Sequence, residues 1–130
     1  MSRSERLLEL LRIARALLEI REQRGLGRAR VGSSGEAVYA ACKGGIVAFS
    51  KTLAREHARH GITVNVVQPG PVDTDMNPVD GPTRDVMHSF MAIKRHGTPA
   101  EIAGMVAYLT GPEAGYVTGA MHTIDGGFGA

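Results

Sequence analysis

One short β-branched run, flanked by helical patterns, limits this 130-residue chain to a small set of folds. The run is ITVNVV at residues 62–67, and a Pro-Gly pair ends it, which predicts a buried strand that enters a loop. A long helical pattern precedes it and extends to Gly61. Ser33 and Glu36 form a capping-box signature at the start of that helix. The sequence therefore predicts a long helix that is followed directly by a buried strand.

The segments after the strand continue the alternation of helix and strand. Residues 70–97 are rich in proline and glycine, which predicts an irregular segment with a short helix around 83–92, and long loops of this kind are often functional lids. The Thr-Pro-Ala-Glu sequence at 98–101 predicts a helix through Leu109, and AMHTIDGG at 120–127 predicts a final strand. This order of elements is typical of half of a doubly wound α/β sheet.

Composition narrows the class of protein further. With 43% hydrophobic and 22% charged residues, the chain is expected to form one soluble, globular domain. No window approaches the roughly eighteen consecutive apolar residues of a membrane span, and the charged start is unlike a signal peptide. The single cysteine, Cys42, excludes an internal disulfide. We therefore expect a cytoplasmic protein that does not interact with membranes.

Residues 1–30 differ in character from the rest of the chain. They hold eight arginines against four glutamates, and apolar residues from Leu7 to Leu18 follow helical spacing until Gly25 and Gly27. Such an amphipathic helix could bind nucleic acid or a membrane, or it could dock on a protein core or partner. Because glutamates are interleaved with the arginines and no aromatic residue is present for base stacking, we expect no nucleic-acid partner.

A tyrosine and a lysine stand four positions apart in the AVYAACKGG sequence at residues 37–45. On a helix, Tyr39 and Lys43 would lie on one face and could point into one site. A nearby ammonium favours the phenolate, so it lowers the pKa of a tyrosine from its usual value of about 10. Such a tyrosine could exchange a proton with an alcohol oxygen near neutral pH. The pattern alone is common, and an exposed pair without a catalytic role is the alternative.

Several motifs in order resemble one enzyme family. The stretches YAACKGGIVAFSKTLAREHARHGITVNVVQPGPVDT and RHGTPAEIAGMVAYLTGPEAGYVTGAMHTIDGG resemble the short-chain dehydrogenase/reductase family, which carries Tyr-x-x-x-Lys, a strand with Asn and a Pro-Gly loop. The resemblance covers residues 31–130 and is nearest to 3-oxoacyl-carrier-protein reductases and hydroxyacyl-type dehydrogenases. It implies the carboxyl-terminal half of a Rossmann-like, doubly wound parallel sheet, to which residues 1–30 add an atypical amphipathic helix and a glycine link.

The resemblance implies a reaction and two catalytic roles. The family interconverts a secondary alcohol or hydroxyacyl group and its ketone with NAD or NADP, so the implied substrate is a small alcohol, ketone or acyl thioester. Tyr39 would be the general acid/base. Lys43 would bind the nicotinamide ribose and lower the pKa of Tyr39.

The loop after the strand would contribute to cofactor binding. By resemblance, Pro69 and Gly70 open this loop, the backbone around Val72 would meet the nicotinamide amide, and Thr74 would reach toward the cofactor phosphates. A simple strand-to-helix turn is the alternative interpretation of the loop. Asn65, which lies in the strand of the family, is expected to be structural.

Departures from the family pattern leave a second function open. Residues 1–30 contain no strand followed by a glycine-rich turn, the element that holds the cofactor pyrophosphate in this fold. Leu26 stands where the family has its catalytic serine, Ser33 is better explained as a helix cap, and no asparagine precedes Asn65. The chain could thus be a truncated, noncatalytic relic or an assembly partner. An incomplete sheet would leave an edge and an apolar face uncovered, which predicts a homo-oligomer.

The histidines give no sign of a metal site. His57 and His60 stand among charged residues, which is typical of a solvated helix face. His88, His96 and His122 are scattered, so no histidine cluster and no bound metal are predicted.

Overall fold

A computed structural model of the chain describes residues 37–130. The amphipathic helix predicted within residues 1–30 and the capping box of Ser33 and Glu36 lie outside the described residues. The described elements, in chain order, are α3 (Ala37–His57), η2 (Ala58–His60), β1 (Val66–Pro69), α4 (Arg84–Phe90), α5 (Pro99–Thr110), η3 (Pro112–Ala114) and β2 (Met121–Ile124).

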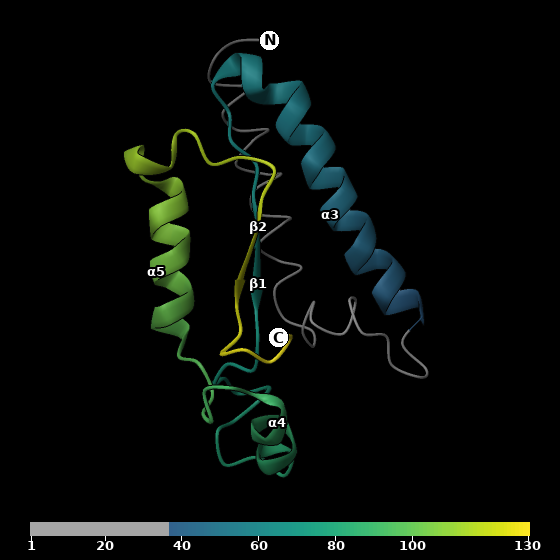
Figure 1. Cartoon of the computed structure of the whole chain (residues 1–130), viewed down its shortest axis with the longest axis vertical. Coiled ribbons are helices and arrows are strands. Elements are labelled where there is room, and N and C mark those ends of the chain that lie inside the picture. The colour runs from purple at the N-terminus through teal and green to yellow at the C-terminus, as the bar shows by residue number, and fades with distance from the viewer. Residues whose placement is uncertain (1–36) are drawn as a thin grey trace.

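The described elements form three layers, with the two strands between α3 and α5 (Figure 1). The strands pair in parallel, in a register that runs from Val66 opposite Met121 to Pro69 opposite Ile124. Parallel strands need a crossover, and α5 lies in the crossover from β1 to β2. The predicted α/β architecture with a parallel sheet is therefore confirmed.

The first predicted helix ends where the sequence indicated. α3 extends to His57, the turn η2 continues it, and Gly61 follows in the left-handed conformation, with φ of 71°. Glycine adopts this conformation at low cost, so it commonly ends helices. The amide of Gly61 donates to the carbonyl of Ala58 and closes the turn. The helix end is thus determined by local sequence.

The capping box predicted at the start of the second long helix is present. The hydroxyl of Thr98 accepts from the amide of Glu101, and the Glu101 carboxylate accepts from the amide of Thr98. Pro99 occupies the first turn of α5, where its missing N–H costs nothing. The short helix predicted around 83–92 is also confirmed, as α4.

The first strand begins later than predicted. The β-branched pattern indicated residues 62–67, whereas β1 covers Val66–Pro69. The carbonyl of Val64 accepts from Gly119, and the amide of Val64 donates to the hydroxyl of Thr118, so this residue bonds a turn rather than a strand. The hydrogen bonds that pair this strand with β2 begin at the amide of Val66, which donates to the carbonyl of Ala120. Pairing with the end of the chain therefore determines the strand position.

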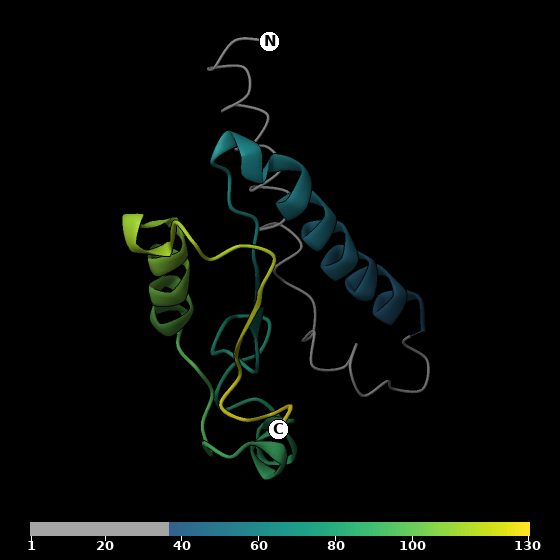
Figure 2. The ribbon, with the colours of Figure 1, turned by 45° about the horizontal axis from the view of Figure 1, so that its top comes forward.

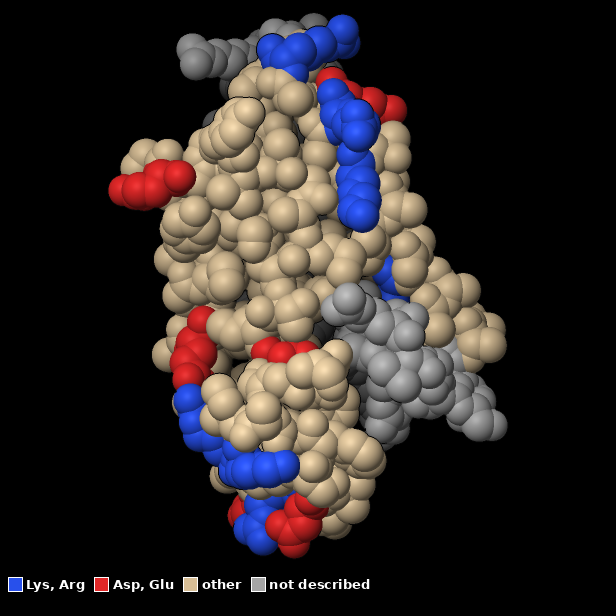
Figure 3. All heavy atoms as spheres, viewed as in Figure 1, with Lys and Arg blue, Asp and Glu red and all other residues tan. Residues whose placement is uncertain are grey.

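The buried residues lie on both sides of the sheet. The apolar ones come from all three layers and from the loops, and they are Leu53, Ala54, Val66, Met91, Ile102 and Ala114. Charged side chains gather toward the two ends of the face seen in Figure 3, and the middle of that face is largely uncharged. No helix within residues 37–130 is both long and apolar enough to cross a bilayer.

Candidate active site

The structure brings Tyr39 and Lys43 together on α3. The Lys43 ammonium nitrogen lies 5.4 Å from the centroid of the Tyr39 ring, within the range of a cation–π contact. Four-residue spacing on a helix produces this contact directly. The segment around the pair is rich in alanine and glycine, so few bulky side chains compete for this face. The pair is therefore a structural unit of the helix.

Burial gives the Lys43 ammonium an unusual environment. Only 8% of Lys43 is exposed, although long charged side chains usually keep the ammonium in water. Burial lowers the pKa of Lys43, and the neighbouring Cys42 thiol offsets this in part. Because a buried charge is poorly screened by water, its field on the nearby ring is stronger than that of a surface lysine. Tyr39 itself is half-buried.

The loop after β1 is held by hydrogen bonds to two other segments. The amide of Gly70 donates to Ile124 at 3.1 Å, which extends the ladder with β2 by one residue. The amide of Gly97 donates to Pro71, and that of Asp73 donates to Gly97, both at 2.9 Å. These bonds fix the loop backbone at the carboxyl ends of the strands, where open α/β sheets bind ligands.

Two groups of this loop remain available to a ligand within the described part of the chain. The carbonyl of Val72 accepts from the side-chain amide of Asn77 at 3.3 Å, but the Val72 amide donates to no described group. Thr74 is exposed, and its backbone pairs with Asn77, which leaves its hydroxyl without a described partner. The backbone of this loop is thus ordered by long-range hydrogen bonds, which both a ligand-binding loop and a simple connecting turn can have.

Asn65 has the structural role expected of it. Its side-chain nitrogen donates to the carbonyl of Val117 at 2.7 Å, and its side-chain oxygen accepts from the amide of Ala120 at 3.2 Å. The His122 ring also lies 3.4 Å from that oxygen. Asn65 therefore joins the start of β1 to the turn before β2.

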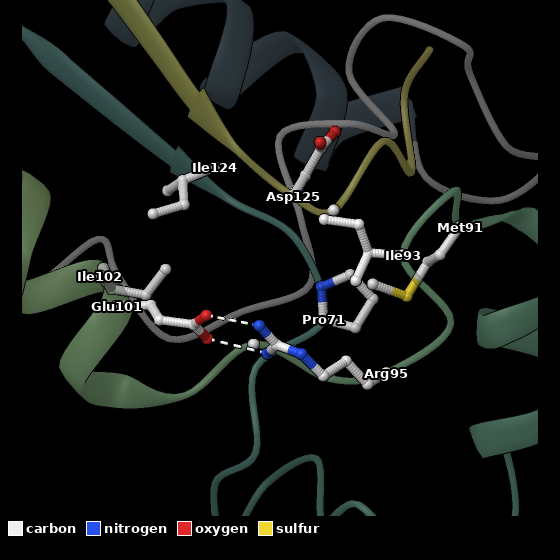
Figure 4. A pocket seen from close by; sticks show the side chains of 10 residues that line it. Pro71, Met91, Ile93, Arg95, Glu101, Ile102, Ile124 and Asp125 are labelled. Carbon is white, nitrogen blue, oxygen red and sulfur yellow. Dashed lines mark hydrogen bonds and ion pairs between the residues drawn. The ribbon is translucent and has the colours of Figure 1, made fainter.

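A pocket of about 290 Å³ lies at the carboxyl ends of the two strands (Figure 4). Its walls are mostly apolar, and they include Pro71 of the loop and Met91, which is 2% exposed. Figure 4 shows the Arg95 guanidinium reaching the Glu101 carboxylate at one wall, with N···O distances of 2.6 and 3.0 Å. These bonds and the Thr98 amide lower the pKa of Glu101 to about 2. No pattern in the sequence predicts this pocket, because it needs segments that are far apart in the chain.

The histidine prediction was wrong in one respect. His88 and His96, which looked scattered in the sequence, have ring nitrogens 2.8 Å apart. Their contact depends on the fold of residues 88–96, which no periodicity predicts. Among residues 37–130, no group of three or more histidine, cysteine or acidic side chains could hold a metal ion.

The two parts of the candidate site lie toward the same end of the molecule. Figures 1 and 2 place the start of α3 and the loop after β1 toward the same end of the molecule, with α4 beyond the strands. Tyr39 and Lys43 come from the first two turns of α3, while Pro69, Gly70 and Val72 come from β1 and its loop. The role of these residues in a common site stays a prediction.

Comparison with known proteins identifies the family. A family model described as "Enoyl-(Acyl carrier protein) reductase" matches residues 25–129, which is most of the chain. Short-chain dehydrogenases/reductases of known structure share the fold, including one from Serratia marcescens at 52% identity and a TM-score of 0.76. That match covers 82% of this chain and 44% of the Serratia chain. The chain therefore belongs to the short-chain dehydrogenase/reductase family.

Two further relatives have descriptive names. The cyclic-di-GMP-binding biofilm dispersal mediator protein of Escherichia coli is 62% identical over 101 residues, which are 78% of this chain and 43% of that protein. The 3-oxoacyl-[acyl-carrier-protein] reductase FabG of Vibrio cholerae is 43% identical over 98 residues, 75% of this chain and 40% of that protein. The chain spans less than half the length of both. Solved relatives include BdcA in complex with NADPH, at 59% identity and a TM-score of 0.75, over 82% of this chain and 44% of BdcA.

Proposed function

We propose that this chain carries the proton-transfer and nicotinamide-side parts of an NAD(P)-dependent oxidoreductase that interconverts a secondary alcohol or hydroxyacyl group and its ketone. One observation supports this most strongly. The buried ammonium of Lys43 lies 5.4 Å from the Tyr39 ring centroid, on a helix that the family comparison covers. If the two residues were an exposed pair without a catalytic role, Lys43 would be expected to lie in solvent rather than buried.

Tyr39 would act as the general acid and base of this reaction. In the reducing direction its hydroxyl donates a proton to the ketone oxygen, and in the oxidising direction its phenolate removes the alcohol proton. Lys43 stabilises the phenolate because its positive charge is close and poorly screened. General acid/base assistance of this kind typically contributes about 10²- to 10⁴-fold to the rate.

The residues of the loop after β1 fit the nicotinamide end of the cofactor. The Val72 amide, which donates to no described group, can donate to a carboxamide oxygen, and the exposed Thr74 hydroxyl can reach a phosphate. Lys43 can also donate to ribose hydroxyls. When bound, the nicotinamide would supply or accept the hydride. Within residues 37–130, no strand leads through a glycine turn directly into a helix, so the pyrophosphate would be held by residues outside this range.

The substrate class proposed here is a ketone with an apolar or acyl-thioester chain. The Vibrio cholerae relative is named as a 3-oxoacyl reductase. Exposed apolar side chains on and before α4 could contact such a chain, namely Met76, Val79, Val86 and Phe90. Met91, by contrast, is buried and fills the core, so it is not proposed as a substrate contact.

A noncatalytic role is the second candidate, and the sheet is the observation that favours it. The described sheet has only β1 and β2, so each strand has one edge without a neighbouring strand in the described part of the chain. Such edges pair readily with other chains. A chain that spans under half the length of its relatives could therefore act as an assembly partner. It could also bind a nucleotide without converting it, as the name of the Escherichia coli relative, a cyclic-di-GMP-binding protein, suggests.

Nucleotide affinity tests the proposal. Titration calorimetry of the full chain with NADPH or NADH should show little heat at millimolar nucleotide, because no pyrophosphate turn is present in the described residues. A chimera with residues 31–130 in place of the matching part of BdcA, the relative solved with NADPH, should bind NADPH with a micromolar Kd.

The lysine provides a matched comparison in that chimera. Lys43→Ala should weaken NADPH binding at least tenfold, since it removes a charge-assisted hydrogen bond. Lys51→Ala, an exposed lysine on the same helix, should leave the affinity unchanged. Equal affinities for the two variants would contradict the assignment of Lys43, and a chimera that binds no nucleotide would contradict the proposed function.

A further inference from the structure

A hydrogen bond between two histidines joins α4 to the segment that follows it. The Nε2 atom of His88, on α4, lies 2.8 Å from the Nδ1 atom of His96, and the ring centroids are 4.9 Å apart. His96 is buried, with 4% of its surface exposed, whereas His88 is half-buried. His96 is therefore the inner partner of the contact, and His88 is the outer partner.

The inner partner is fixed to the loop after β1. The neighbouring Gly97 exchanges hydrogen bonds with Pro71 and Asp73 across an isolated bridge, and Arg95 donates to the carbonyl of His96 at 2.9 Å. His96 thus moves with the loop that contains Val72.

The outer partner belongs to a weakly attached helix. No residue of α4 is buried. Besides hydrogen bonds to adjacent residues of the chain, α4 has a contact between the rings of Phe90 and Phe128, with centroids 6.3 Å apart, and accepts a hydrogen bond from Lys94 at the carbonyl of Ser89, at 3.1 Å. An element with so few buried contacts opens at low free energy. Loss of the His88–His96 bond would therefore affect α4 more than the sheet.

The bond tolerates only one arrangement of protons at low cost. The Nε2 atom of His96 is buried and has no hydrogen-bond partner within the described residues. A proton there would be a buried, unpaired N–H, so the favoured neutral form has His96 Nδ1–H donating to Nε2 of His88. A proton on Nε2 of His88 removes that acceptor, and a second proton on His96 creates the unpaired N–H. Either protonation opposes the contact.

Groups around the pair shift the pKa of His96 both upward and downward. The Asp73 carboxylate raises the pKa of His96, but burial and the neighbouring His88 lower it by more. Asp85 lies near His88 and is itself ion-paired with Arg84 at 2.8 Å. On the adjoining segment, Arg95 and Glu101 pair with each other. Because the pKa of His96 is lowered in the folded chain, the stability of this contact is present above about pH 6.5 and is lost as the pH falls below it.

We propose that the His88–His96 hydrogen bond is a pH-sensitive latch, which holds α4 against the loop after β1 at neutral pH and releases it on mild acidification. The proposal concerns a conformational change in residues 84–97 and does not require catalysis by the chain. Histidine is the side chain suited to this range, because its usual pKa is about 6.5.

Amide hydrogen exchange of the full chain at pH 7.5 and pH 5.0, corrected for intrinsic rates, tests the latch. The amides of Met87 and Met91, which donate to Thr83 and His88, report on α4. Their protection should fall at least about fivefold at pH 5.0, the effect expected from loss of one hydrogen bond. The amide of Val66, which donates to Ala120, should change less than twofold. Unchanged protection of α4, or an equal loss in β1, would overturn the proposal.

A variant that keeps the acceptor without titrating sharpens the test. In His88→Gln the side-chain oxygen can accept from His96 Nδ1–H at both pH values, so only protonation of His96 can still weaken the contact, and the loss of α4 protection at pH 5.0 should be smaller than in the wild type. His60→Gln, at an exposed histidine outside this contact, should behave like the wild type. Retention of the full pH effect in His88→Gln would overturn the latch. If His88→Gln fails to fold, NMR titration of the wild-type ring nitrogens decides, because His96 must protonate below pH 6.5, and protonation above it would overturn the proposal.

Discussion

Gly70 and Asp125 approach each other so closely that no side chain fits between them. A Cβ built on Gly70 would lie 2.6 Å from Cα of Asp125 and 2.8 Å from its carbonyl oxygen. Both neighbours are backbone atoms, which cannot rotate away as a side chain could. The two residues directly follow β1 and β2, so this contact sets the spacing of the strand ends from which the candidate cofactor loop starts.

The first prediction follows from this contact. Gly70→Ala should lower the free energy of unfolding by about 1–3 kcal/mol, because the backbone must shift to accommodate the methyl group. Urea unfolding measures the effect. Gly104→Ala is the matched control, since its Cβ would meet nothing within 4 Å and alanine favours a helix by about 1 kcal/mol. A Gly70→Ala chain as stable as the wild type would show that the strand ends separate easily.

Asn65→Ala should destabilise the chain without any direct role in proton transfer. The change removes the hydrogen bonds of Asn65 to Val117 and Ala120 and leaves part-buried backbone groups unpaired. A loss of about 1–3 kcal/mol is expected in urea unfolding. Asn77→Ala, which loses one side-chain hydrogen bond of 3.3 Å, should cost less. A larger effect at Asn77 would contradict the structural role given to Asn65.

Features that depend on neighbouring residues in the chain were predictable from the sequence. The capping box of Thr98 and Glu101 needs only residues three apart, and the contact of Tyr39 with Lys43 needs only four-residue helical spacing. The left-handed Gly61 that ends the first helix is local in the same way.

Features that depend on distant segments were not predictable. The β-branched pattern marks residues 62–67, but the chain pairs from Val66 because residues 64 and 65 bond the turn before β2. The contact of His88 with His96 arises from the path of the chain after α4, which follows no period. The pocket beside Arg95 likewise requires the ends of both strands and the start of α5 to be in place.

The Glu101 carboxylate should make stability depend on acid. Its pKa is lowered to about 2 from a usual value of 4.5, first by the hydrogen bond from Arg95 and then by the amide of Thr98. A lowered pKa means that the contribution is present above about pH 4.5 and is lost as the pH falls toward 2. In urea unfolding, the advantage of the wild type over Glu101→Gln should therefore shrink between pH 4.5 and pH 2.5.

An exposed glutamate serves as the control for this pH effect. Glu113 lies in η3 and takes part in no described ion pair. The stability difference between the wild type and Glu113→Gln should therefore not shrink between pH 4.5 and pH 2.5. Added salt should reduce the Glu101 effect, because the pair with Arg95 is partly exposed. A difference between the wild type and Glu101→Gln that is constant with pH would contradict the assignment.

The full chain should self-associate. Within residues 37–130, both strands have an edge without a neighbouring strand, and large apolar side chains such as Phe49, Tyr108 and Tyr116 are exposed. Edges and apolar patches of this kind recruit other chains. Light scattering should detect dimers, tetramers or aggregates at micromolar concentration. A stable, monodisperse monomer would contradict this expectation.

The most direct test of the central claim is the rate of the chimera that carries residues 31–130, with NADPH and a 3-oxoacyl thioester as substrates. Tyr39→Phe should lower kcat by about 10²- to 10⁴-fold, because it removes the proton donor, while NADPH affinity is retained. Tyr116→Phe makes the same chemical change at a fully exposed tyrosine and should leave kcat unchanged. If Tyr39→Phe kept the rate of Tyr116→Phe in a folded, NADPH-binding chimera, Tyr39 would not be the acid and the proposed site would be wrong.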